Sequence, residues 1–203
     1  YDVILVTTDE GFESVKKDYP KTEYIDSLPK AISEFREHAK TGTQTQHNKY
    51  TFTHNTALVD KSGEIQKLVA EKGTLESDEA QKIADDALGG YLNSLYRSLK
   101  NLRDGNELAG HLDATDTIPS ILIFIFAIEN RVRPFNKFLV WELKNYPLTK
   151  LSISSSDFIE KIKTIAKNAD FETQKEVLEI MRKLAMENGH SDEIASWEGY
   201  YFG

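Results

Sequence analysis

The sequence predicts an α+β protein in which a small part with a mixed sheet precedes a part made only of helices. Two observations support this prediction. Three strand signals occur before Gly73, and the apolar period of amphipathic helices runs through the rest of the chain. Strands and helices segregated in this way favour two modules over alternating βαβ units. We therefore expect an α+β domain over residues 1–73 and a helical-bundle domain over residues 74–203.

The first part is organised around its opening strand, Tyr1-Asp2-Val3-Ile4-Leu5-Val6. Side chains alternate along a strand, so Asp2 shares a face with Ile4 and Val6. The pattern then predicts a helix over 12–19, with Asp9 and Glu10 as capping residues. The further elements expected in this part are a strand over 22–25, a helix over 27–39, a polar loop over 41–48, a strand over 50–59, a turn over 60–63 and a short helix over 65–73.

Glycines and prolines divide the helical part. A long apolar stripe predicts a helix over 77–102 that ends at Gly105 and is weakened by Gly89-Gly90. A loop over 110–116 is expected to lead to Pro119, placed at the start of a helix that runs to residue 132. Further helices are expected over 135–145, 156–168 and 170–188, with a brief one near the end.

Composition narrows the classes of function. The chain of 203 residues is 39% hydrophobic, has a formal charge of −8 and contains no cysteine. The negative charge argues against a broad nucleic-acid surface and suits a cationic small molecule, and the lack of cysteine makes the cytoplasm the default compartment. The most apolar run, residues 118–128, is too short to span a bilayer, so no membrane association is expected.

Two carboxylates near the start form the first candidate site. Asp2 begins the first strand and Glu23 lies on the second predicted strand, so neighbouring strands would bring both carboxylates to one face. Two such groups would bind a hard cation such as Mg²⁺, which carries phosphates with it. The alternative is that both are solvated residues at strand ends. Asp26, on the opposite face of that predicted strand, competes with Glu23.

These residues also carry a resemblance to a family. Tyr1-Asp2-Val3-Ile4-Leu5-Val6 resembles the second half of the nucleotidyltransferase signature, and residues 21–27 are similar to the strand with its third metal carboxylate. Residues 51–68 look like the closing strand of that domain, and the later helices look like the substrate domain of kanamycin and lincosamide nucleotidyltransferases. The Gly-Ser turn of the signature would lie before Tyr1. With no initiator Met, we expect that a segment preceded this chain.

The resemblance implies a metal-dependent transfer of a nucleoside monophosphate, from an NTP such as ATP, to a hydroxyl of a small, antibiotic-like acceptor. Asp2 and Glu23 would hold Mg²⁺, and Arg97 and Lys100 would contact the triphosphate. Each of these two cations could equally be an ordinary solvated charge beside the helical stripe. A homodimer is the assembly that the resemblance allows.

One departure from the family concerns the general base. Related enzymes carry a Glu for this role on the first long helix, and the equivalent position here is Asn93 or Tyr96. Asp85 and Asp86 lie two or more turns earlier on that helix. A catalytically inactive binding or regulatory module is therefore the alternative function, and a helical scaffold without nucleotide is the third.

A second cationic cluster, Arg131-Val132-Arg133-Pro134-Phe135-Asn136-Lys137-Phe138, lies between two predicted helices. Cations there could bind a phosphate or an acidic substrate group, with Arg133 and Lys137 as the candidates. They could also serve the carboxyl end of the preceding helix, which is the preferred interpretation. The five histidines show no spacing that suggests zinc, and His54 alone lies near the proposed site.

Overall fold

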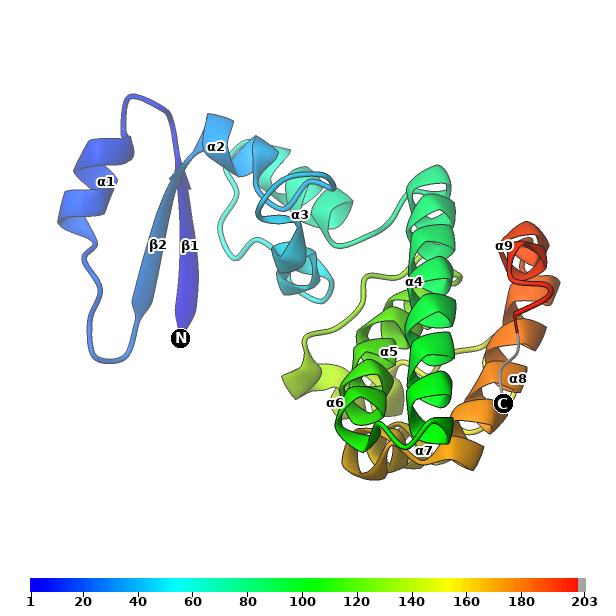
Figure 1. Ribbon diagram of the computed structural model, residues 1–203. Coiled ribbons are helices and arrows are strands. Elements are labelled where there is room, and N and C mark those ends of the chain that lie inside the picture. Colours follow the sequence, from blue (N-terminus) through cyan, green and yellow to red (C-terminus); the bar gives the residue numbers. More distant parts are fainter. Residues whose placement is uncertain (201–203) are drawn as a thin grey trace. The chain divides into compact units, whose positions relative to one another are not determined.

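A computed structural model describes residues 1–200 and combines many helices with a small parallel sheet (Figure 1), which is compatible with the α+β class. The chain divides into two compact units, Tyr1–Thr74 and Leu75–Gly203, one residue from the boundary expected from the sequence. We call them unit 1 and unit 2. Within residues 1–200 no helix combines the length and apolar character needed to cross a membrane.

Unit 1 opens with strand β1 (Asp2–Thr7), helix α1 (Phe12–Asp18) and strand β2 (Asp26–Ala31). The two strands pair in parallel, so this segment is a βαβ unit rather than the segregated arrangement that we predicted. Figure 1 shows α1 on one side of the strands and α2 (Ile32–Glu37) and α3 (Glu64–Lys72) on the other. A parallel pair requires this kind of crossover, and α1 provides it.

The predicted strand over 22–25 is wrong, because these residues form the turn that precedes β2. The Thr22 hydroxyl accepts the backbone N–H of Ile25 at 3.0 Å, and the Thr22 N–H donates to the Ile25 carbonyl at 2.8 Å. The strand follows at residues 26–31, where the sequence had suggested a helix beginning near Pro29. Proline is compatible with a strand that has one unpaired edge, because its missing N–H is not needed there.

The third predicted strand, over 50–59, is also wrong, so the mixed sheet is replaced by two parallel strands within residues 1–200. Residues Gln46–Phe52 form a 3₁₀ helix, η1, and the chain then runs irregularly to α3. The core of unit 1 explains the difference. Phe52 packs with Phe35, Ala39 and Val69, and Ile4 and Val6 of the sheet cover this cluster. The backbone near residue 57 bonds to α3 instead of to a strand, since Ala57 N–H donates to Gln66 Oε1 at 2.8 Å.

Helix α3 is confirmed, and Asp60 organises its start. Asp60 Oδ1 accepts the N–H groups of Ser62 and Gly63 at 3.0 and 2.9 Å, and Oδ2 accepts the N–H of Gln66 at 2.8 Å. Gly63 has a φ of 76°, the positive value expected for it in this turn. These bonds to the ionised carboxylate hold the pKa of Asp60 below its ordinary value of 3.8.

The lowered pKa of Asp60 predicts how the start of α3 responds to acid. A depressed pKa means that the carboxylate stabilises the fold above pH 3.8, and that this stabilisation is lost as the pH falls through the lower, folded-state value. The amide resonance of Gln66 should therefore titrate with a midpoint below 3.8. The Asp60→Ala variant should lack that titration, and the exposed neighbour Lys61→Ala should keep it. A midpoint at or above the ordinary value would contradict the bonding described for Asp60.

Unit 2 is a helical assembly centred on α4 (Ser77–Arg103) and α5 (Glu107–Ala127), which pack along each other. The remaining elements are η2 (Asn136–Phe138), α6 (Leu139–Asn145), α7 (Ser155–Asn168), α8 (Phe171–Glu187) and α9 (Ser191–Ser196). The expected helices over 77–102, 156–168 and 170–188 are confirmed within a few residues, and Gly105 ends α4 with a φ of 79°.

Three expectations for this unit are wrong. Pro119 was expected to begin a helix but lies inside α5, and the other two concern small residues in helix contacts. Gly89-Gly90 does not split α4; a Cβ at Gly89 would lie 2.7 Å from Glu193 Oε1, so the missing side chain permits a close approach. The loop expected over 110–116 belongs to α5. Gly110 lies against Leu102 of α4 and its carbonyl accepts the Ser98 hydroxyl at 2.8 Å, so Gly110 is a packing residue.

Tyr91 of α4 offers a stability test for this core. Its side chain is buried, its hydroxyl has no hydrogen-bond partner among residues 1–200, and burial raises its pKa far above the usual range. A buried hydroxyl without a partner costs about 1–3 kcal/mol, so Tyr91→Phe should leave the free energy of unfolding unchanged or raise it by about 1 kcal/mol. Denaturant unfolding measures this change. A loss of more than about 1 kcal/mol would show that the hydroxyl has a partner in solution.

Candidate functional site

The register of the sheet places two carboxylates directly beside each other. Asp2 of β1 is paired with Asp26 of β2, Ile4 with Leu28, and Val6 with Lys30. Paired residues in adjacent strands point to the same face and lie about 5 Å apart. Asp2 and Asp26 therefore share the face on which Ile4 and Val6 reach the core, at the amino ends of both strands.

The surroundings of this pair are open to solvent. Asp2 is exposed, and Leu28, the next residue of β2 on the same face, is 43% exposed. Lys21 Nζ lies 2.9 Å from Asp26 Oδ2, but the Lys21 side chain is 69% exposed. An exposed ion pair of this kind contributes about 0–1 kcal/mol and can exchange partners. We call Asp2 and Asp26 the carboxylate pair.

Two carboxylates alone are an incomplete set of ligands for a hard cation such as Mg²⁺. Mg²⁺ prefers oxygen ligands and is commonly held by one or two carboxylates together with substrate phosphates and water. Within residues 1–200 no group of three or more His, Cys, Asp or Glu side chains is arranged to hold a metal. A cation bound here would thus need oxygen ligands in addition to the two carboxylates.

Glu23 does not occupy the position that the sequence suggested. It lies in the exposed turn before β2, three residues ahead of Asp26, and the sheet register does not set it opposite Asp2. The face assignment was also wrong for Asp26, which shares the face of Asp2 instead of opposing it. The role of Glu23 as a metal ligand stays a prediction, whereas the carboxylate opposite Asp2 is Asp26.

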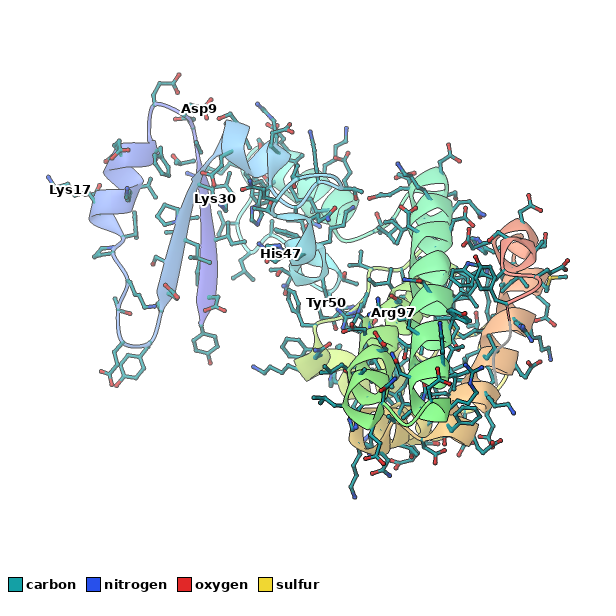
Figure 2. The ribbon with its side chains drawn as sticks, in the orientation of Figure 1. Asp9, Lys17, Lys30, His47, Tyr50 and Arg97 are labelled. Carbon is teal, nitrogen blue, oxygen red and sulfur yellow. The ribbon has the colours of Figure 1, made fainter. Side chains whose placement is uncertain are left out.

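At the other end of the sheet, Asp9 has a structural role. Figure 2 shows Asp9 in the connection that follows β1, and its Oδ1 accepts the Ser33 N–H and hydroxyl at 3.1 and 2.7 Å. These two bonds hold the pKa of Asp9 below its usual range. A capping role was expected for Asp9 at α1, but the helix that it caps is α2.

Arg97 and Lys100, the two cations expected at the triphosphate, both lie on α4 (Figure 2 labels Arg97). Arg97 Nη2 donates to Oδ1 of Asp113, a buried carboxylate on α5 that also accepts Asn101 Nδ2 at 2.9 Å. Lys100 is exposed, with its Nζ 5.9 Å from the centre of the Tyr96 ring. The contact with Asp113 gives Arg97 a role in joining α4 to α5, and the nucleotide roles of both residues stay predictions.

Of the two acidic residues considered as general bases, Asp85 is bonded to another side chain. Asp85 Oδ1 lies 2.6 Å from Nδ1 of His190, a buried histidine near the start of α9, and Gln81 Nε2 is 3.1 Å from the same nitrogen. The link joins residues 105 positions apart. No sequence pattern indicates this link, because His190 has no recognisable spacing from Asp85. His54, the histidine expected near the site, stacks edge-on with Tyr50 in unit 1 at 6.0 Å.

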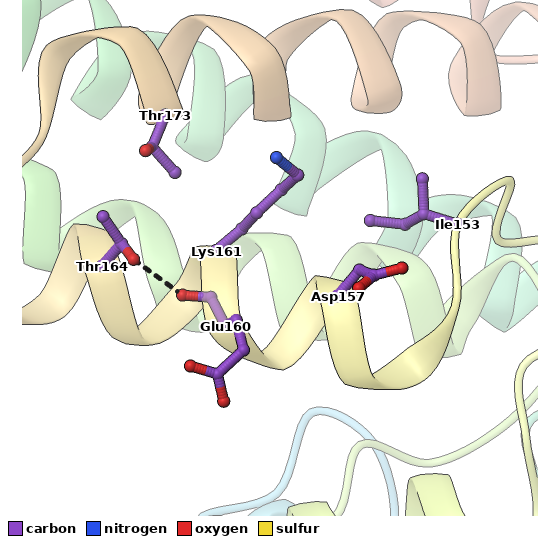
Figure 3. Close-up of a pocket in the computed structure, with 6 residues that line it drawn as sticks. All are labelled: Ile153, Asp157, Glu160, Lys161, Thr164 and Thr173. Atoms are coloured by element: carbon purple, nitrogen blue, oxygen red, sulfur yellow. Dashed lines mark hydrogen bonds between the residues drawn. The ribbon is translucent and has the colours of Figure 1, made fainter.

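Unit 2 also contains an open groove of about 420 Å³ between α7 and α8 (Figure 3). Its polar groups bond to one another or to nearby residues: Lys161 pairs with Glu176, and the Thr164 hydroxyl donates to the Glu160 carbonyl at 2.9 Å. Lys161 is therefore already compensated, and the groove has no convergent set of free polar groups. The lining residues are Ile153, Asp157, Glu160, Lys161, Thr164 and Thr173.

No family model, no curated protein and no solved structure matches this chain.

Proposed function

We propose that unit 1 binds a Mg²⁺–nucleoside triphosphate at the carboxylate pair and that the protein is a nucleotidyltransferase, which moves a nucleoside monophosphate from an NTP, with ATP expected, to a hydroxyl of a small, antibiotic-like molecule. The observation that carries the proposal is the register that pairs Asp2 with Asp26 at the solvent-exposed amino ends of the two strands. We also propose that unit 1 is a nucleotidyltransferase domain and that unit 2 is a helical substrate domain.

The charges around the pair support a triphosphate ligand. The bound cation would neutralise part of the phosphate charge, and the two carboxylates would hold the cation at the strands. Lys21 is within an ion-pair distance of Asp26, and its exposed side chain is free to exchange the carboxylate for a phosphate oxygen. Asp2, Asp26 and Lys21 are thus the residues proposed to bind the ligand. Arg97 has no role in this binding, because its guanidinium already pairs with the carboxylate of Asp113.

Calorimetry of ATP binding with and without Mg²⁺ tests the proposal first. The expected result is saturable binding that requires the metal. Transfer is tested by incubating the protein with Mg²⁺–ATP and a panel of hydroxylated small molecules, including aminoglycosides and lincosamides. Release of pyrophosphate, together with an acceptor heavier by one nucleoside monophosphate, would establish the reaction. Failure to bind ATP in the presence of Mg²⁺ would exclude the proposed function.

A second candidate is a nucleotide-binding module without catalysis. The residues of α4 at the expected general-base position favour it. The position expected for a general base holds Asn93 or Tyr96, and the carboxylate of Asp85 is bonded to His190. Neither an amide nor a neutral phenol is an efficient general base. Metal-dependent ATP binding without pyrophosphate release, with every acceptor tried, would support this second function.

A further inference from the structure

The segment between α5 and α6 contains two arginines in very different environments. Arg131 Nη2 donates to Glu142 Oε1 at 2.6 Å and to the Tyr146 carbonyl at 2.9 Å, and Glu129 lies 3.7 Å from Nη1. Its charge is thus balanced by two carboxylates, both nearly buried. Arg131 therefore has a structural role, but its side chain bonds at the carboxyl end of α6, whereas the preferred interpretation placed the cations at the end of the preceding helix.

Arg133, two residues later, has no such compensation. Among residues 1–200 its Nε is buried without a hydrogen-bond partner, and the one acceptor for its side chain is the neutral Asn136, whose Oδ1 lies 2.5 Å from Nη2. No acidic residue pairs with it within residues 1–200, and burial lowers the pKa of its guanidinium. A buried donor left unpaired costs free energy, more so when the group is charged, so proteins retain such a group for a reason.

The neighbours of Arg133 extend the positive charge. Lys137 is exposed, forms no ion pair in the described part of the chain, and lies with its Nζ 5.2 Å from the centre of the Phe138 ring. Pro134 restricts the backbone of Arg133 to extended conformations, which limits the positions that its side chain can take. The segment therefore presents a guanidinium on a restrained backbone, an amide bonded to it and, four residues along the chain, an exposed ammonium.

We propose that Arg133, with Asn136 and Lys137, binds the oxyanion of a small molecule. A phosphate or a carboxylate matches the planar fork of a guanidinium and accepts two N–H groups at once. It also balances the positive charge of Arg133, which has no acidic partner within residues 1–200. This site lies within unit 2 and does not depend on the carboxylate pair. Its ligand can be a phosphate ester or a carboxylic acid, and the experiment separates the two.

The test follows the Nε–Hε resonance of Arg133 in the full chain during titration with inorganic phosphate or with acetate, at an ionic strength kept constant with chloride. The resonance is assigned by its loss in Arg133→Gln. We expect a saturable shift with at least one of the two anions, and the anion that binds more tightly identifies the ligand class. Shifts that grow linearly, as with chloride, would overturn the proposal.

The variants supply the second readout. Arg133→Gln should weaken anion binding about tenfold or more, measured from the shifts of neighbouring amides, without lowering the midpoint of thermal unfolding. Arg131→Gln, the matched control, should do the opposite: lower the midpoint and keep anion binding. Undiminished anion binding in Arg133→Gln would also overturn the proposal, and so would a fall in its unfolding midpoint as large as that of Arg131→Gln, because Arg133 would then be structural.

Discussion

Replacing Asp26 with Asn is expected to weaken Mg²⁺–ATP binding by about tenfold to a hundredfold, because an amide keeps the shape of the carboxylate but loses its charge. The same loss is expected for Asp2→Asn, since the two residues are paired across β1 and β2. Both positions are exposed or half-buried at strand ends, so the substitutions should leave thermal unfolding almost unchanged. Isothermal titration calorimetry measures the binding, and circular dichroism measures the fold.

Glu23→Gln is the matched control for this prediction. It removes a carboxylate three residues from Asp26, in the turn before β2, and should leave the affinity for Mg²⁺–ATP unchanged. If Glu23→Gln abolished binding while Asp26→Asn had no effect, the ligand would be the residue first expected from the sequence. The sheet register would then have misidentified the partner of Asp2.

The Arg97→Ala substitution should lower the free energy of unfolding by about 2 kcal/mol. Removing one partner of a buried ion pair costs about 3–5 kcal/mol, and the value expected here is smaller because the Arg97 side chain is 54% exposed. The variant leaves Asp113, which is 6% exposed, with Asn101 as its remaining donor. Urea unfolding followed through the helical signal measures the change.

Lys100→Ala serves as the comparison, because Lys100 lies one turn from Arg97 on the same helix and is exposed. Its effect on stability should stay within about 0.5 kcal/mol. Neither substitution should alter Mg²⁺–ATP binding, since the proposal uses residues of unit 1. If the Arg97→Ala protein were stable but no longer bound ATP, Arg97 would contact the triphosphate, as the family resemblance implied.

Part of this structure follows from local rules in the sequence. Alternation along the first strand predicts the face of Asp2, and the apolar period predicts α4, α7 and α8. Gly63 and Gly105 adopt the positive φ expected after Asp60 and at the end of α4. These features depend on residues a few positions apart, so single-sequence patterns contain the necessary information.

The features that the sequence did not predict depend on one local turn and on contacts between distant residues. The strand that pairs with β1 begins at Asp26 because Thr22 closes a turn, and the two candidate carboxylates are only three positions apart. The strand expected over 50–59 includes Phe52, but packing against Phe35 favours a 3₁₀ helix there. The partner of Arg97 lies 16 positions away on α5, where no local pattern could identify it.

The most direct test of the carboxylate pair is to locate the bound metal itself. Mn²⁺ replaces Mg²⁺ with ATP and broadens the amide resonances of nearby residues. The account predicts that broadening is strongest at residues 2, 3, 26 and 27, at the amino ends of β1 and β2, and that Asp2→Asn reduces it. Strongest broadening near Asp9 or Asp60, with residues 2 and 26 unaffected, would contradict it.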